Sequence, residues 1–400
     1  MKSSLPPSWS IDQPVRASYL VFGRPDIHEK DIQSVVDTLR SGWIGTGPRV
    51  AEFEGAFGEY IGSSHALAVH SGSSGLHLSM VALDLKPGDE VIVPSMTFAA
   101  TANAVIHAGA TPVLVDVDPR TMCLDVAHME ASISTRTRAV IPVHFAGRFC
   151  AMEAIMRLAE AHNLFVIEDC AHAVETRFQG RHAGTFGNMG AFSFYVTKNV
   201  TTGEGGMICT DDPERAARIK ILALHGLDAD AWRRFSDEGF KQYEVLEPGF
   251  KYNMMDIQAA LGIPQLERVE ANLKRRCEIW EQYDDAFKDL PLDTPEEEER
   301  GTVHARHLYT VILDIDRLKS DRDTIQEALH RQNIGTGVHY RALHLHKYYR
   351  DEFRYKPEDL PHARWISDRT LSLPLSPQMT DEDVYDVVFS LRKTLQYYTH

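Results

Sequence analysis

"LFVIEDCAHA", residues 164–173, is the stretch that decides the fold. Its apolar half runs without interruption into Glu168 and Asp169, and small residues with His172 follow. A short, continuous apolar run predicts a strand covered on both faces, as in parallel sheets flanked by helices. In such open sheets, ligands bind at the carboxyl ends of the strands. The two carboxylates therefore mark the edge of the sheet where a functional site is expected.

Further runs of the same kind precede and follow this one, and helical patterns separate them. They are "HALAVH" (65–70), "EVIVP" (90–94), "TPVLVDV" (111–117), "RAVIPVH" (138–144), "GAFSFY" (190–195) and "GMICT" (206–210). This alternation predicts an α/β fold with a mainly parallel central sheet flanked by helices.

The second half of the chain has a different pattern. Apolar residues recur at helical spacing from Asp256 to Lys288, which predicts one long helix connecting two domains. Beyond the acidic loop "DTPEEEER" (293–300) we expect a smaller α+β unit. Its elements are a strand "HLYTVIL" (307–313), a helix "RDTIQEALHRQN" (322–333), a strand "GTGVHY" (335–340) and a final helix after "LPLSPQMTDEDV" (373–384). The predicted organisation is an N-terminal arm (1–20), a large domain (21–262) and a small C-terminal domain (263–400).

The composition excludes several classes of protein. A chain of 400 residues with 43% hydrophobic content can bury a large core. The 42 Lys and Arg against 57 Asp and Glu give a net charge of −15, which disfavours nonspecific binding to nucleic acid or to an anionic membrane. No run approaches the roughly 18 apolar residues of a membrane span, and the scattered cysteines form no CxxC pair. We therefore expect a cytoplasmic protein with reduced thiols and no metal site.

The segment "HSGSSGLHLSM" (70–80) is a candidate phosphate site. Small residues follow a predicted strand and lead into an apolar helical pattern, so Gly72, Ser73 and Ser74 lie at a helix N-terminus. Backbone N–H groups and hydroxyls at such a position bind phosphate. An ordinary serine-capped helix is the alternative interpretation of the same residues.

A single lysine occupies an unusual place in "SFYVTKNVTTGEGG" (193–206). Lys198 follows a strand-like aromatic run and precedes a glycine-rich turn. A partly desolvated lysine at a sheet edge loses its proton and forms a Schiff base with a carbonyl. A desolvated Asp169 requires a cation, such as a protonated pyridine nitrogen. The alternatives are a solvated surface lysine, a helix-capping aspartate and, for His172, a hydrogen-bonded core imidazole.

These three stretches together fit pyridoxal 5′-phosphate (PLP). They supply a phosphate cradle, a carboxylate for the ring nitrogen and an amine for the aldehyde. Phe98, in "PSMTFAATANAV" (94–105), adds an aromatic face that stacks on a pyridine ring, although an isolated phenylalanine also fits an apolar core. PLP is the cofactor that these residues predict.

The order and wording of the motifs resemble the DegT/DnrJ/StrS family of PLP-dependent nucleotide-sugar aminotransferases. The resemblance extends from "FGRPDI" at residue 22 to "SLPLSP" at residue 372. It includes "SGWIGTGPRVAEFE", "PVLVDVD", "PGFKYNMMDIQAAL" and "GTGVHYRALHLHKYY" besides the stretches above. It implies a PLP-dependent transferase fold of type I, and a homodimer whose active sites are shared between subunits.

The resemblance also implies a role for each candidate residue. Lys198 is the lysine that binds the cofactor, Asp169 pairs with the ring nitrogen and His172 lies near the ring hydroxyl. The other implied contacts are Ser73, Ser74 and Ser193 at the phosphate, Phe98 over the ring, and Asn253 or Lys251 of the partner subunit, again at the phosphate. Many members have Thr-Ala at the position of Ser73 and Ser74, and glutamine at the position of His172.

The implied reaction is a two-stage transamination. L-glutamate converts the lysine-bound cofactor to pyridoxamine 5′-phosphate, which then aminates a keto group of a nucleotide-linked keto-hexose, at C4 rather than C3. Lys198, once released, moves the proton between the cofactor's C4′ and the substrate carbon. The product is an amino sugar for a polysaccharide or a secondary metabolite.

Some assignments have alternatives. Lys251, His339, His344 and His346 are candidate contacts for the pyrophosphate of the substrate, or the histidines belong to an ordinary surface strand and loop. A sugar dehydratase or lyase that uses PLP on the same fold is an alternative function. A noncatalytic sensor that binds PLP or a sugar nucleotide is another.

Overall fold

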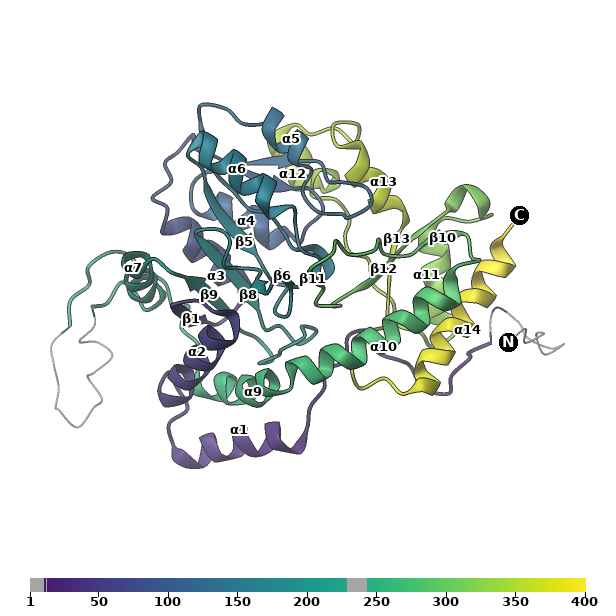
Figure 1. Ribbon diagram of the computed structural model, residues 1–400, viewed down its shortest axis with the longest axis horizontal. Helices are drawn as coiled ribbons and strands as arrows, with labels where there is room; N and C mark the ends of the chain where they lie inside the picture. The colour runs from purple at the N-terminus through teal and green to yellow at the C-terminus, as the bar shows by residue number, and fades with distance from the viewer. Residues whose placement is uncertain (1–10, 12, 229–242) are drawn as a thin grey trace.

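The computed structural model describes residue 11, residues 13–228 and residues 243–400 (Figure 1). Residues 1–10 and 12 of the predicted N-terminal arm lie outside the described residues. A large sheet with its helices occupies one end of the molecule, and a smaller sheet lies at the other end, near the C-terminus (Figure 1). In the described ranges, none of the helices has the length and apolar character that crossing a membrane requires.

The large sheet has seven strands in the order β1-β9-β8-β5-β4-β2-β3. Its strands are β1 (His65–Val69), β2 (Glu90–Pro94), β3 (Thr111–Val115), β4 (Thr137–Val140), β5 (Phe165–Asp169), β8 (Met189–Ser193) and β9 (Gly206–Thr210). β9 pairs antiparallel with both of its neighbours, and all other pairs are parallel. The mainly parallel sheet predicted from the apolar runs is confirmed, with its strands at the predicted places.

Both faces of this sheet are covered, which explains why its strands are so apolar. Along β9, Ile208 packs into one apolar core while Met207 and Cys209 pack into another, as alternation along a strand requires. The helices of this half are α1 (Glu29–Ser41), α2 (Pro48–Ile61), α3 (Gly72–Val81), α4 (Ala99–His107), α5 (Val126–Ala131), α6 (Met152–His162) and α7 (Pro213–Ala223).

The second half contains a three-stranded antiparallel sheet in the order β10-β12-β13. Its elements are β10 (Leu292–Asp293), β12 (Tyr309–Leu313), β13 (Thr370–Leu373), α11 (Arg322–Arg331), α12 (Lys347–Phe353), α13 (Pro361–Arg369) and α14 (Asp381–Tyr398). A third, short sheet joins β6 (Arg177–Phe178), β7 (Arg181–His182) and β11 (Thr302–Val303). The predicted strand at 307–313, the helix at 322–333 and the final helix are confirmed.

The predicted strand "GTGVHY" is wrong. Within this segment Gly337 forms one isolated bridge, to Ser372, and Ile334, just before the segment, forms another to Leu20. A Cβ at Gly337 would lie 2.8 Å from the ring of His339, so the glycine allows that ring to fold back onto the backbone. The apolar and polar alternation of the segment suggested a strand, but close packing around its glycines prevents a regular ladder.

The predicted single helix from 256 to 288 is two helices, α9 (Asp256–Glu267) and α10 (Val269–Phe287). Pro264 lies inside α9 and the helix ends at Arg268. In a continuous helix, the backbone N–H of Arg268 would donate to the carbonyl of Pro264. Here the Arg268 side chain donates to that carbonyl instead, from Nη1 (2.9 Å). The same guanidinium binds both carboxylate oxygens of Asp31 on α1, and this ion pair fixes α1 against the break.

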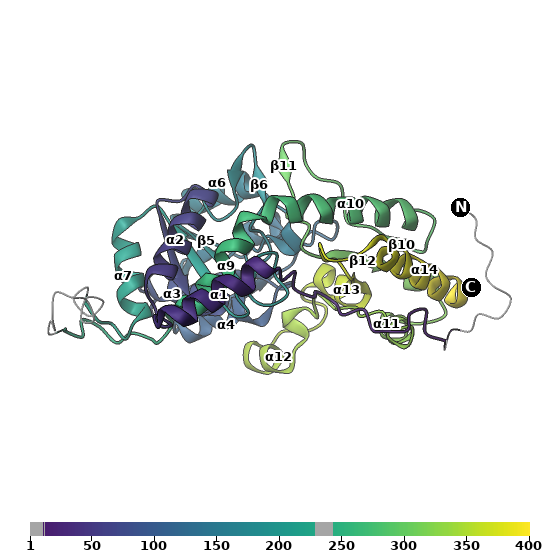
Figure 2. The same cartoon turned by 90° about the horizontal axis from the view of Figure 1, so that it is seen from below.

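The N-terminal segment connects the two ends of the molecule (Figure 2). Arg16 pairs with Asp383 and Asp386 of α14, and the chain then runs alongside the small sheet to α1. The predicted domain boundary at residue 262 falls inside α9. Leu343 and Ile366, from the predicted small domain, pack into the core of the large sheet. The division of the chain into domains stays a prediction.

We expect Asp31→Asn to destabilise the fold. The Asp31 side chain is fully buried; burial alone raises its pKa, but hydrogen bonds from Arg268, His28 and Gln265 outweigh that effect and hold the pKa below its ordinary value. Removing the carboxylate leaves Arg268 with the more distant Asp26 carboxylate (3.7 Å), and we expect this to cost about 3 kcal/mol of unfolding free energy. Thermal and denaturant unfolding measure this loss. An unchanged unfolding free energy would contradict the role given to the pair.

Candidate active site

The segments singled out in the sequence meet at one edge of the large sheet. β1, β5 and β8 run in the same direction, so their carboxyl ends lie together. A cavity of about 520 Å³ opens at this edge. From the predicted set, its lining contains Gly72, Ser73, Phe98, Asp169, His172, Ser193 and Lys198. Seven of the nine predicted cofactor residues therefore share one cavity, and Ser74 and Asn253 do not line it.

Lys198 lies in the turn that follows β8, and its backbone N–H donates to the carbonyl of Tyr195 (2.8 Å). Desolvation lowers the pKa of the Lys198 amine to about 8, although the nearby Asp169 carboxylate acts in the opposite direction. An amine with such a pKa is partly unprotonated near neutral pH and is therefore nucleophilic.

Asp169 is the last residue of β5 and is almost completely buried. Thr101 donates its hydroxyl to Oδ2 (2.9 Å) and the Ala171 N–H donates to Oδ1 (3.1 Å). Desolvation nevertheless raises the pKa of this carboxyl, while the two hydrogen bonds and the Lys198 amine act in the opposite direction. A carboxylate that lacks solvation and faces a cavity fits a cationic group such as a protonated pyridine nitrogen.

His172 follows Asp169 and forms part of the same wall. Its Nδ1 accepts a hydrogen bond from the Ala146 N–H (3.2 Å), so the neutral ring carries its proton on Nε2. Nε2 lies 3.1 Å from the hydroxyl of Tyr340, which also lines the cavity. Burial lowers the pKa of His172 well below its ordinary value, and the Lys198 charge adds to this shift. His172 therefore acts as a neutral hydrogen-bonding group.

The predicted phosphate cradle forms at the N-terminus of α3, where Ser71 is the N-cap. Helix geometry leaves the N–H groups of Gly72 and Ser73 without intrahelical acceptors, as an anion requires. A Cβ at Gly72 would lie 2.8 Å from the Cβ of Ser193, so glycine permits the close approach of the two segments. Ser74 points elsewhere: its N–H donates to Ser71 Oγ (3.1 Å) and its hydroxyl contacts the His70 ring (2.9 Å).

Phe98 stands at the mouth of the cavity as the N-cap residue of α4 and is 62% exposed. Its ring centroid lies 6.2 Å from that of Tyr340. A core position, the alternative interpretation of Phe98, is thereby excluded. The exposed ring leaves an aromatic face available to a planar ligand.

Lys251 and Asn253 lie in a neighbouring open hollow of about 700 Å³, which shares Ser71 and Glu204 with the first cavity. Asn253 donates from Nδ2 to Thr46 Oγ1 (2.6 Å), and its buried Oδ1 has no hydrogen-bond partner among the described residues. In this protomer, neither residue reaches the first cavity.

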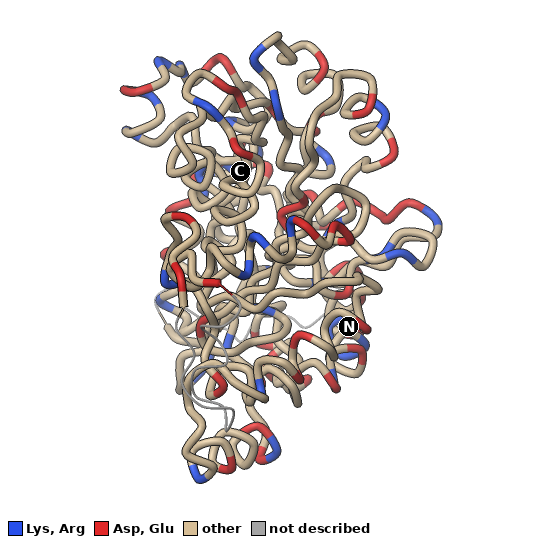
Figure 3. The backbone as a smooth tube through the Cα atoms, turned by 90° about the vertical axis from the view of Figure 1, so that its left-hand side faces the viewer, with Lys and Arg blue, Asp and Glu red and all other residues tan. Residues whose placement is uncertain are grey.

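The three histidines proposed to contact a pyrophosphate lie in different environments, and only His339 lines the cavity. His339 lines the cavity, but desolvation and the Lys198 charge lower its pKa to about 4, so it supplies no positive charge at neutral pH. His344 is buried against Ser95 Oγ (2.8 Å), and His346 is exposed and contacts the carbonyl of Arg341. Figure 3 shows acidic and basic residues interspersed along the chain. The backbone N–H groups at the start of α3 are therefore, besides Lys198, the anion-binding groups that the cavity offers.

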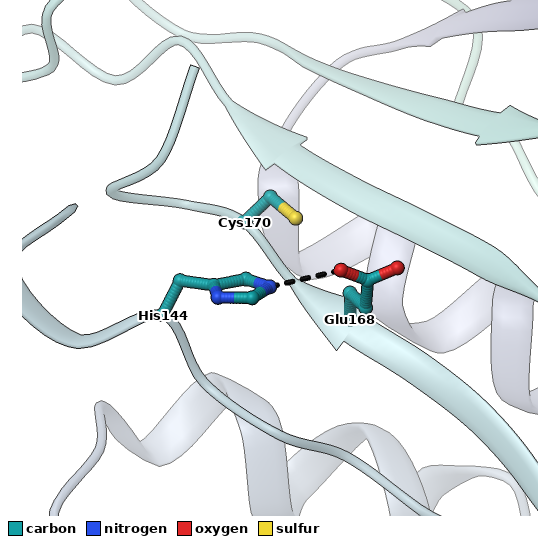
Figure 4. A group of neighbouring side chains, drawn as sticks. All are labelled: His144, Glu168 and Cys170. Carbon is teal, nitrogen blue, oxygen red and sulfur yellow. Dashed lines mark hydrogen bonds and ion pairs between the residues drawn. The ribbon is translucent and has the colours of Figure 1, made fainter. Parts of the chain in front are cut away.

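Glu168 precedes Asp169 on β5 and so faces the opposite side of the sheet. Figure 4 shows it beside His144 and Cys170, and the ligand atoms of the three residues lie within 4.8 Å of one another. The Glu168 carboxylate accepts hydrogen bonds from His144 Nε2 (2.9 Å) and from the N–H groups of Gly184 (2.8 Å) and Gly187 (2.6 Å). These bonds already satisfy the buried carboxylate, so we assign it a structural role.

Thr101 and Tyr340 belong to the site but were not predicted from the sequence. Thr101 lies three residues after Phe98 at the start of α4, where helical spacing brings a hydroxyl to the same end of the sheet. That spacing was a usable signal. No comparable signal pointed to Tyr340. Its segment was predicted to be a strand, and its contact with His172 joins distant parts of the chain.

Comparisons with known proteins agree with this geometry. The family model for the DegT/DnrJ/EryC1/StrS aminotransferase family matches residues 25–392. The chain is 47% identical over 379 residues to the spore coat polysaccharide biosynthesis protein SpsC of Bacillus subtilis, covering 94% of this chain and 97% of SpsC. It is 50% identical over 380 residues to the uncharacterized protein MJ1066 of Methanocaldococcus jannaschii, covering 95% and 98% of the two chains.

Solved structures give the same result. The putative sugar aminotransferase Spr1654 from Streptococcus pneumoniae, in its PMP form, has a TM-score of 0.88 and 31% identity, covering 95% of this chain and 98% of its own. Helicobacter pylori PseC, an aminotransferase involved in the biosynthesis of pseudoaminic acid, has a TM-score of 0.87 and 27% identity, covering 95% and 100%. The predicted fold is confirmed. The chain belongs to the DegT/DnrJ/EryC1/StrS aminotransferase family.

Proposed function

We propose that this enzyme transfers an amino group from L-glutamate to C4 of a nucleotide-linked keto-hexose, in the biosynthesis of an amino sugar. The observation that carries the proposal is that three groups line one cavity. They are the Lys198 amine, whose pKa is lowered, the buried Asp169 carboxylate and the N-terminus of α3. The predictions of an aminotransferase and of PLP as cofactor are confirmed by the family and by solved relatives in PLP and PMP forms.

PLP, when bound, supplies an electron sink for the carbanion that transamination requires. The residues of this chain fit it: Asp169 would offer a buried carboxylate to the ring nitrogen, and the N–H groups of Gly72 and Ser73 would hold the phosphate. Lys198 offers the amine for the aldehyde. Phe98 offers a face for the ring, and Ser193 lies beside the cradle.

Lys198 has a second role in this proposal. When it is not bonded to the cofactor, its amine would be the base that takes a proton from the substrate carbon and the acid that returns it. A pKa of about 8 suits this exchange, because the amine then holds or releases a proton near neutral pH. The neutral His172 and the Tyr340 hydroxyl hold the neighbouring wall by their hydrogen bond.

The substrate assignment rests on relatives. SpsC is named for spore coat polysaccharide biosynthesis, and PseC acts in the biosynthesis of pseudoaminic acid. Both names support a sugar as the amino acceptor. The nucleotide group, the C4 position and glutamate come from the resemblance of the motifs and stay predictions.

We also infer a homodimer that shares its active sites. The open hollow with Lys251 and Asn253 adjoins the cavity, and the Oδ1 of Asn253 has no hydrogen-bond donor among the residues that the structure describes. Met255 lines the hollow, and Trp43 and Ile44 directly precede two of its lining residues, Gly45 and Thr46; the three apolar side chains are 46–48% exposed. Such a rim is typical of a surface that another protein chain covers. The partner's copies of Lys251 and Asn253 then approach the phosphate.

Lys198→Ala tests the enzyme assignment. With PLP, the wild-type protein is expected to show a lysine-dependent absorbance band that L-glutamate converts to the pyridoxamine form, whereas the variant shows neither. Lys86→Ala, at an exposed loop lysine, is the matched control and is expected to behave like wild type. A band that glutamate leaves unchanged would favour the dehydratase or lyase alternative. The absence of any lysine-dependent band would favour the sensor.

Mixing inactive subunits tests the shared site. Lys198→Ala and the double variant Lys251→Ala/Asn253→Ala are each expected to lose activity as homodimers. Mixed dimers regain one complete site, so random exchange restores about a quarter of wild-type activity. Activity that stays at the level of the separate variants after demonstrated subunit exchange would contradict sharing through these residues.

A further inference from the structure

We propose that Asn199 is a positioning residue, whose side chain ties the Lys198 turn to a buried ion pair beneath it. The ion pair joins Glu175, which follows β5, to Arg276 of α10. The proposal deepens the proposed function and rests on Lys198 being the lysine that binds the cofactor. It concerns the residues behind the cavity wall, since neither Asn199 nor the ion pair lines the cavity.

Every hydrogen-bonding group of the Asn199 amide is used. Its Nδ2 donates to Glu175 Oε2 (2.8 Å) and to the carbonyl of Ala305 (2.9 Å). Its Oδ1 lies 3.0 Å from Nδ1 of His307, which is the donor in this pair because an amide oxygen only accepts. One side chain thus fixes the residue next to Lys198 to two separate segments, one with Glu175 and the other with Ala305 and His307.

The ion pair provides a fixed base for this link. The Glu175 side chain is fully buried and that of Arg276 is 2% exposed. Desolvation raises the pKa of Glu175, whereas the Arg276 charge and the Asn199 hydrogen bond act against the shift and favour the carboxylate. A buried pair of this kind holds its geometry because losing either partner leaves an uncompensated charge. Arg276 also belongs to α10, so the link reaches the helix that connects the two sheets.

His307 extends the network to the second wall of the cavity. With its proton on Nδ1 toward Asn199, the His307 ring lies against that of His172, with ring centroids 4.5 Å apart. His172 in turn contacts Tyr340. Asn199 therefore stands between the lysine turn and the histidine wall, and its loss would loosen both.

The position of the turn determines the environment of the lysine. The ionisable groups that share the electrostatic environment of Lys198 are Asp169, His172, His307 and His339. Thr197, which precedes Lys198, packs against Gly23. A Cβ added at Gly23 would lie 3.2 Å from the Thr197 side chain. If the turn moves outward, the amine gains solvent and its pKa rises toward the ordinary value of lysine.

Asn199→Ala and Glu175→Gln test the proposal. Asp31→Asn is the control, because it breaks a second buried ion pair whose residues do not line the cavity. The rate at which apoprotein bonds to PLP through Lys198, measured against pH and trapped by borohydride, reports the pKa of the amine. Asn199→Ala is expected to raise this pKa by about one unit and to slow the glutamate half-reaction about 100-fold, as for a reacting group displaced by about 1 Å. Glu175→Gln is expected to raise the pKa of the amine and to slow the glutamate half-reaction as well.

The control separates positioning from stability. Asp31→Asn is expected to lower the melting temperature without changing the pKa or the rate. If Asn199→Ala lowers the melting temperature but leaves the pKa of the amine unchanged and the rate of the glutamate half-reaction within twofold of wild type, the positioning role is overturned. Asn199 is only partly buried, so this variant is informative even if Glu175→Gln fails to fold. Covalent PLP on Lys198→Ala, found by mass spectrometry, would overturn the proposed lysine itself, whatever the Asn199 result.

Discussion

The site depends on one buried carboxylate. Asp169 ends a central strand in the interior, with one hydroxyl and one backbone N–H as donors to its two oxygens. Desolvation raises its pKa, so an ionised Asp169 requires a cation close by. The Lys198 ammonium is such a cation in the protein alone, and the protonated ring nitrogen of PLP is the one that the cofactor brings. In the proposed function, the carboxylate would favour a cationic ring and keep it protonated.

The parallel sheet makes this arrangement possible. Strands that run in one direction bring the phosphate cradle, the carboxylate and the lysine to one edge, although they are far apart in sequence. Burial then shifts the pKa values of Lys198 and Asp169 toward each other, down for the amine and up for the carboxyl. The Lys198 amine, with a pKa of about 8, is thereby suited to hold or release a proton near neutral pH.

Much of this was predictable from the sequence, because it depends on local patterns. Apolar runs gave the strands of the large sheet, and the residues that follow them gave most of the cavity. The failures involve contacts between distant segments. The helix break at Arg268 depends on an ion pair with Asp31, and the strand expected at "GTGVHY" is prevented by packing around Gly337. Tyr340 and Asn199 act through partners that no local pattern indicates.

Nitrogen NMR of the enzyme loaded with PLP labelled at its ring nitrogen tests the central claim most directly. The wild-type protein is expected to give the signal of a protonated ring near neutral pH, and Asp169→Asn the signal of an unprotonated ring, because the amide cannot stabilise the positive charge. The same protonation state in both proteins would contradict the account.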